Sequence, residues 1–250
     1  MRRWHLAVLL MLMAGTSTLP AQARSARWAV DGQTSLAWWQ VDPNHGHLWA
    51  TTCPSDPSWQ PGEGRDAGLN VDYEHRPEIA LSARSDARIP LFPRGAVTPV
   101  CRRAVRGEIT ADDAQRFHGV RGTVAVTADS LFTGLGLRDA YARRAVLHTG
   151  RYPELRFTID SLVEVQPGDT LRATAVGVFE AHGVRHATRA PLVAWRDSAG
   201  FRVRAQFSVP ATALVEEFNM SRWALGMGVV SRRWKTLHMG VDVILQPAGS

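Results

Sequence analysis

The chain of 250 residues is poor in the groups that carry most redox and enzyme chemistry. Its two cysteines, Cys53 and Cys101, lie too far apart for the close C-x-x-C spacing of redox couples. The sequence has no G-x-S-x-G, no H-E-x-x-H and no glycine loop of the kind that binds phosphate. We therefore expect a protein that is not an enzyme and that uses no cofactor.

Apolar runs long enough to cross a bilayer are also missing, since a spanning helix takes roughly 20 apolar residues. The longest run, residues 6–14, follows an Arg pair and precedes an A-Q-A triplet that ends at Ala23. This order is typical of a cleaved secretory signal peptide, with a retained anchor as the alternative. We expect residues 1–23 to be removed and residues 24–250 to form one exported domain, periplasmic or extracellular.

The charge pattern does not favour nucleic acid as a partner. The formal net charge is +6, and it falls to +4 when Arg2 and Arg3 are removed with the signal peptide. Every basic residue except Lys235 is Arg, and the arginines of the later strands are scattered rather than clustered with aromatic residues. Binding of nucleic acid needs a basic stripe or a stacking platform.

What the chain does contain is regular alternation of apolar and polar residues, which is typical of strands with one buried face. Val124 and Val126 alternate with polar neighbours, and so do Phe157 and Ile159. Between these two runs the apolar residues recur at three- and four-residue spacings, which indicates short helical turns. The stretch 119–162 therefore predicts a strand, a helical segment and a second strand.

The same stretch resembles a known family. An alternating strand with Phe157 follows four short motifs in a fixed order: Ser130-Leu131, Thr133-Gly134, Arg138-Asp139-Ala140 and Tyr152-Pro153. This order is similar to the central signature of the YceI-like family. The resemblance runs from about Trp28 to the C-terminus, with one interruption. It implies an exported, lipocalin-like antiparallel barrel that holds a polyisoprenoid or another long-chain amphipathic lipid.

The remaining chain predicts about seven to nine strands with one apolar face, and hence an all-β antiparallel barrel or sandwich. The clearest alternation covers residues 201–209, and Pro210 is expected to begin a short helix. Thr110 and Asp113 have the spacing of a capping box and predict another helix start. Small side chains occupy many inward positions, namely Ala173, Ala175, Gly177, Ala194 and Ala205.

These small side chains are consistent with a cavity, and the alternative is a tightly packed core that the tryptophans fill. The resemblance implies the hollow form, a barrel of about eight strands with short helical caps. In that form each buried methylene of a lipid tail contributes about 0.8 kcal/mol to binding. We expect the ligand to be lined by Val124, Val126, Phe157, Ile159, Phe201, Val203, Phe207, Met239 and Val241, with Trp38 and Trp39 near a mouth.

The family pattern is interrupted between about residues 43 and 106 by an insertion rich in Pro, Gly and Trp. We expect this insertion to cover one mouth or edge of the barrel. In an exported protein its two cysteines, Cys53 and Cys101, are expected to form a disulfide. Closing so long a loop would stabilise the fold by about 4 kcal/mol. A redox or metal-binding thiol pair is the alternative.

Two histidine pairs could in principle bind a metal ion. His45 and His47 lie on one side of an extended segment, but a site needs three or four ligands and no third is evident. His182 and His186 have metal-ligand spacing only in a helix, whereas Gly183 predicts a turn there. Hydrogen-bonded histidines are the simpler interpretation of both pairs. Besides the lipid carrier, two functions stay open: a solid partner-binding barrel, and a metal-binding protein using His45 and His47. The sequence does not indicate an oligomeric state.

Overall fold

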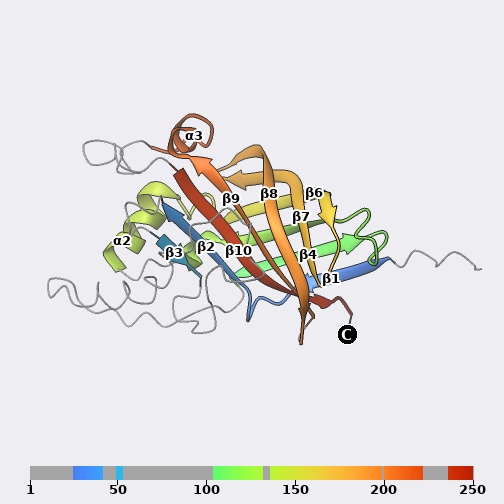
Figure 1. Ribbon diagram of the computed structural model, residues 1–250. Coiled ribbons are helices and arrows are strands. Elements are labelled where there is room, and N and C mark those ends of the chain that lie inside the picture. The colour runs from blue at the N-terminus through green and yellow to red at the C-terminus, as the bar shows by residue number, and fades with distance from the viewer. Residues whose placement is uncertain are drawn as a thin grey trace, which may run out of the picture.

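The computed structural model describes residues 25–41, 49–52, 104–131, 136–198, 200–221 and 236–249. Strands dominate these segments (Figure 1). The strands are β1 (Ala26–Val30), β2 (Leu36–Val41), β3 (Trp49–Thr51), β4 (Val105–Ala111), β5 (Arg121–Thr127), β6 (Glu154–Gln166), β7 (Thr170–Ala181), β8 (Val184–Asp197), β9 (Gly200–Pro210) and β10 (Thr236–Pro247). The helical elements are a 3₁₀ turn (Ala128–Ser130), α2 (Gly136–Tyr141), a π-helical turn (Ala142–Val146) and α3 (Ala211–Glu216).

The sheet closes on itself to form a barrel. Its order is β1-β4-β5-β6-β7-β8-β9-β10-β2-β3, and β1 also pairs with β10. Every pairing is antiparallel. β1 and β2 pair one after the other with the same edge of β10, so together they count as one strand of the barrel. The result is the predicted eight-stranded antiparallel barrel, with β3 added beside β2 outside the closed circuit.

A hydrogen-bonded turn joins β1 to β2 at the edge of β10. Val30 lies opposite Leu245 and Leu36 opposite Asp242, so the turn adds residues that β10 does not match. The amide of Asp31 donates to the carbonyl of Ile244 at 2.8 Å, and the amide of Ile244 donates to Ser35 Oγ at 3.0 Å. These hydrogen bonds satisfy the amides of Asp31 and Ile244 where β1 ends and β2 begins.

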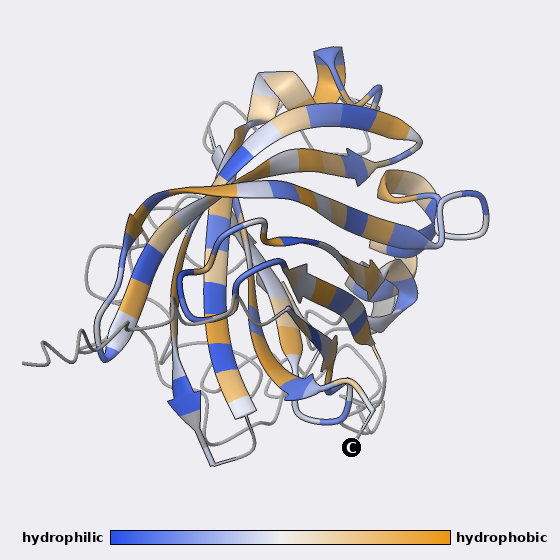
Figure 2. Cartoon of the chain, turned by 90° about the vertical axis from the view of Figure 1, so that its right-hand side faces the viewer, coloured by the Kyte–Doolittle hydropathy of each residue, from blue (hydrophilic) through white to orange (hydrophobic). Residues whose placement is uncertain are grey.

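The alternation seen in the sequence sets which side chains face the interior. Phe207 lies opposite Met239 and Ala205 opposite Val241, whereas Gln206 lies between them on the outer face. Figure 2 shows the same alternation as changing colours along the strands. Side chains alternate between the two faces of a strand, so the register of each strand pair decides which set faces the interior. Here the apolar set of each strand faces inward.

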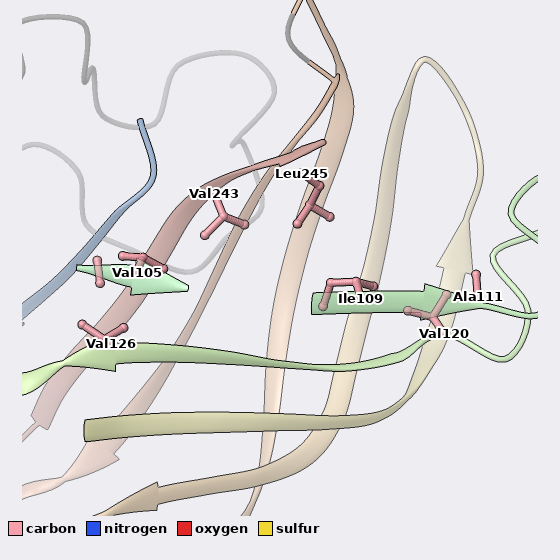
Figure 3. Packing of buried hydrophobic residues seen from close by; sticks show 8 residues of the cluster. Val105, Ile109, Ala111, Val120, Val126, Val243 and Leu245 are labelled. Carbon is pink, nitrogen blue, oxygen red and sulfur yellow. The ribbon is translucent and has the colours of Figure 1, made fainter. Parts of the chain in front are cut away.

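One apolar cluster joins β4 and β10, the strands that pair with β1 on its two sides. Val105 and Ile109 of β4 pack with Val243 and Leu245 of β10, and Val120 and Val126 contribute from β5 and the residue before it (Figure 3). Fully burying an aliphatic side chain of this kind contributes roughly 1.5–3 kcal/mol. The cluster therefore holds the early and late strands of the chain together.

Different elements cover the two ends of the barrel. The β5–β6 connection with its helical turns and the β9–β10 connection with α3 leave from the same end, called here the α3 end. There Leu214 and Phe218 pack against Phe179 and Leu147. At the opposite end, Trp28 and Phe201 meet edge-on with ring centroids 6.1 Å apart. The predicted helical segment after Ala128 and the predicted helix after Pro210 are both confirmed.

The helix start predicted at Thr110 is wrong. Thr110 lies inside β4, and residues 112–119 form a hairpin loop in which Asp113 bridges to His118. The Asp113 carboxylate accepts hydrogen bonds from the amides of Gln115 and Arg116, as it would at a helix start. Asp113 therefore forms an Asx turn within its own loop rather than a capping box with Thr110.

The boundaries of the predicted insertion also change. Trp49–Thr51 forms β3, and β4 begins at Val105, so both ends of the 43–106 stretch contribute strands. Several predictions lie outside the described residues, namely the signal peptide 1–23, the interior of the insertion, the disulfide between Cys53 and Cys101, and the candidate ligands His45 and His47.

Candidate ligand-binding site

A cavity of about 120 Å³ lies inside the barrel. Side chains of β2 and of β4 to β10 surround it, and Leu131 joins them from the β5–β6 connection. The polar members of its lining are Arg156 and Gln206, and both alternate with inward-facing neighbours, so their side chains point away from the interior. The interior surface is therefore apolar.

The cavity borders most of the residues that the sequence predicts to contact a ligand. They are Trp38, Trp39, Val124, Val126, Phe157, Ile159, Val203, Phe207, Met239 and Val241. Trp39 lies opposite Met239 on the inward face. Trp38 alternates to the other face, where its indole packs so closely over Gly240 that a Cβ there would collide with it.

Phe201, which the sequence also predicts to contact a ligand, does not border the cavity. Its side chain has the predicted inward direction, because it shares a face of β9 with Val203. It lies beside the β8–β9 turn, however, where it packs on Trp28 at the end of the barrel opposite the α3 end. Alternation predicts the direction of a side chain but not its depth along the barrel axis.

Other lining residues were missed by sequence reasoning. Phe179 is the largest of them, and it packs on Phe207 with ring centroids 4.9 Å apart. It lies in a run that is apolar on both faces, so alternation could not assign it. Its position opposite the inward-facing Phe157 in the β6–β7 pair shows that Phe179 faces the interior. The larger aliphatic side chains that were also missed are Ile109, Leu131, Leu155, Leu192, Val243 and Leu245.

Small side chains create the space. Ala175 and Ala190 lie opposite each other on β7 and β8, and Ala205 continues the same face on β9. Ala175 and Ala190 are 2% and 4% exposed, so they border space that solvent barely reaches. Apolar cavities of roughly 150 Å³ in protein cores stay dry and bind small apolar molecules. The interior can accept an apolar group in the same way.

Histidines hold the cap at the α3 end. His182 Nε2 lies 2.9 Å from His148 Nδ1, and His182 Nδ1 lies 3.1 Å from the carbonyl oxygen of Phe218. Burial lowers the pKa of His182, the carbonyl opposes this shift, and His148 and Arg151 add to it. A neutral His182 can donate to Phe218 from Nδ1 and accept from His148 at Nε2. The contact ties the β7–β8 turn to the segment after α3.

The predicted turn at Gly183 is confirmed. His182 and Gly183 both have positive φ, 53° and 78°, as a two-residue hairpin turn requires. His186 lies beyond it on β8, where its Nε2 is 2.5 Å from Glu217 Oε2. Within the described segments, no group of three or more His, Cys, Asp or Glu residues could hold a metal ion.

The outer face of the barrel carries a buried ion cluster. Asp242 is 3% exposed and accepts hydrogen bonds from Arg202 and Arg204 at 2.7 Å each. The guanidinium of Arg204 also lies over the ring of Trp195, 5.3 Å from its centroid. The cluster crosses β8, β9 and β10 on the side away from the cavity. Its role is therefore to join strands rather than to contact a ligand inside.

The fold and the cavity define a class: a hollow eight-stranded antiparallel barrel with an apolar interior. Within the described part of the chain, no helix is long and apolar enough to span a membrane. A family model described as "YceI-like domain" matches residues 92–241. The chain belongs to the YceI-like family.

Three solved structures of low sequence identity are similar to this chain. BcnA from Burkholderia cenocepacia is 9% identical, with a TM-score of 0.54 over 86% of this chain and 98% of its own. A polyisoprenoid-binding domain from Saccharophagus degradans is 11% identical, with a TM-score of 0.46 over 90% of this chain and 99% of its own. The YCEI protein from Campylobacter jejuni is 11% identical, with a TM-score of 0.42 over 52% of this chain and 73% of its own. A search of curated proteins gave no match.

Proposed function

We propose that this protein is an exported binding protein that holds the chain of a long amphipathic lipid, of the polyisoprenoid or fatty-acid type, inside its barrel. The observation that carries the proposal is the apolar cavity, which interior side chains leave open. Membership of the YceI-like family supports it. The domain from Saccharophagus degradans is described as polyisoprenoid-binding, which is a property of that domain.

The size of the cavity limits what it holds in the described conformation. At about 120 Å³ it matches a short stretch of hydrocarbon rather than a whole lipid. Burying five methylenes would contribute about 4 kcal/mol to binding. A longer chain requires side chains to move, and Met239 is suited to this because an unbranched thioether adopts many rotamers. The remainder of the ligand would extend through an opening in the wall or at an end.

A charged residue inside the barrel tests the proposal. Phe157→Arg places a guanidinium in the apolar cavity and should abolish binding of farnesol, measured by titration calorimetry. Thr123→Arg is the matched control, because Thr123 alternates with Val124 on the outer face of β5. Arg204→Ala would be a poor control, since Arg204 neutralises the buried Asp242. Equal binding by the two Arg variants would show that the cavity is not the binding site.

A further inference from the structure

The barrel wall is open between β8 and β9 toward the α3 end. The two strands pair from Asp197–Gly200, beside their turn, to Leu192–Ala205. Beyond that point β8 continues to Val184 paired with β7, and β9 continues to Pro210 paired with β10. Figure 1 shows the two strands diverging toward α3. Because this part of their facing edges is unpaired, β8 and β9 leave a gap in the wall toward the α3 end.

A second pocket, of about 310 Å³, lies at this gap. Residues 186–189 of β8 form one side, residues 207–210 form the other, and α3 with the residues after it covers the gap. Phe207 borders both this pocket and the barrel cavity. One aromatic side chain therefore separates the apolar interior from the second pocket, which we call the β8–β9 pocket.

The β8–β9 pocket carries the polar groups that the cavity lacks. His186 and Glu217 are each about half exposed in their 2.5 Å contact, so both reach solvent at the rim. Thr188 and Ser208 add hydroxyls, and these contact the carbonyl of His186 and the ring of His238. An amphipathic ligand needs such groups, because burying a hydroxyl without a hydrogen-bond partner is unfavourable.

The charges of the pocket indicate what kind of head group fits. Glu217 contributes a carboxylate, whereas the guanidinium of Arg189 already donates to Glu164 at 2.8 Å. Arg189 is the only arginine or lysine among the described residues of the lining, so a phosphate or carboxylate head would face the carboxylate of Glu217 without an unpaired guanidinium or ammonium there to offset it. A hydroxyl head can donate to Glu217 and can accept from His186.

We propose that the β8–β9 pocket binds the head group of the ligand, and that this head is an uncharged hydroxyl on a long apolar chain. The inference rests on the proposed function, since the chain of the same ligand occupies the barrel. The chain passes Phe207, and the head lies between the unpaired strand edges beneath α3.

Photo-crosslinking locates the head directly. A farnesol analogue with a diazirine beside the hydroxyl is bound to the full mature chain, irradiated, and mapped by peptide mass spectrometry. We expect crosslinks to residues 186–189, 207–210 and 213–218. Saturable binding with crosslinks elsewhere would overturn the head-group site alone. If the protein binds neither the analogue nor any other long-chain lipid, the proposed function fails as well.

A charge comparison tests the chemistry of the head. Wild-type protein should bind farnesol about tenfold or more tightly than farnesyl monophosphate, because the phosphate is repelled at short range by Glu217. Glu217→Gln should remove most of this difference. The matched control is Glu216→Gln, since Glu216 is an exposed neighbour on α3 that does not border the pocket. A wild-type preference for the phosphate, or an equal effect of the two variants, would overturn the assignment.

Discussion

Filling the cavity should stabilise the protein and weaken its binding at the same time. Ala175 is 2% exposed, borders the cavity and lies opposite Ala190, so a larger side chain there has space in front of it. We choose Ala175→Leu, which adds three carbon atoms on the inward face of β7. A solid core would have no room for this change, and the variant therefore distinguishes a hollow barrel from a filled one.

The expected gain follows from the volume of the cavity. A cavity of about 120 Å³ costs the fold up to about 3 kcal/mol at roughly 24 cal/mol per Å³. Three buried carbons recover at most about 2.4 kcal/mol, and imperfect packing reduces this. We expect the free energy of unfolding to rise by about 1–2 kcal/mol. Displacing about two methylenes of the ligand should weaken binding about tenfold.

Urea denaturation and titration with farnesol measure the two effects on the same sample. A rise in the midpoint at constant m-value reports the gain in stability. Ala29→Leu is the control, because Ala29 is exposed on β1 and should change neither quantity. A loss of about 1 kcal/mol or more in Ala175→Leu would refute the reasoning, since it would mean that the added side chain strains a core already packed.

Three further predictions concern stability. Burial lowers the pKa of His182, so the unfolded chain binds this proton more strongly than the folded chain does. The contribution of His182 is therefore complete above about pH 6.5 and is lost as the pH falls through the lowered pKa. When the pH is lowered from about 7.5 to 5.5, the melting temperature of wild type should fall more than that of His182→Asn. Asn is chosen because it tolerates the positive φ of this turn. Equal falls in the two proteins would contradict the prediction. Asp242→Asn leaves two arginines without their buried carboxylate and should cost about 3–5 kcal/mol in urea denaturation. Glu108→Gln, at an exposed pair with Arg27, should cost far less because solvent screens that pair, and similar costs for the two variants would contradict the distinction. Gly240→Ala should lower the melting temperature because its Cβ meets the Trp38 ring, whereas Gly168→Ala, whose Cβ would make only ordinary van der Waals contact with the Thr170 backbone, should leave it nearly unchanged. Equal melting temperatures for these two variants would show that Trp38 adapts freely.

Much of the barrel could be predicted because its strands have one polar face. Phe207 and Met239 alternate with polar neighbours, and the structure places them opposite each other on the inside. The family resemblance supplied what alternation cannot, namely closure of the sheet into a hollow barrel rather than a sandwich. Glycine and proline marked the turn at Gly183 and the start of α3 at Pro210 for local steric reasons.

Other features depend on contacts between residues far apart in the chain. Phe201 packs on Trp28, which is far from it in the sequence. The contact of His182 with His148 depends on how the β7–β8 turn meets the β5–β6 connection at the α3 end. Through the gap between β8 and β9, β9 keeps its alternation, whereas β8 places the polar residues His186 and Thr188 at positions in phase with the inward Ala190. Pro191 lies where the pairing ends and has no amide hydrogen to donate, which is the nearest local indication.

Native mass spectrometry shows directly whether the barrel holds a lipid, using the mature protein expressed with export and then incubated with farnesol. We expect a stoichiometric complex with a copurified long-chain lipid or with the added alcohol, and loss of that complex in Phe157→Arg. Protein that carries no lipid after export and takes up none when it is offered would show that the barrel is not a lipid-binding site.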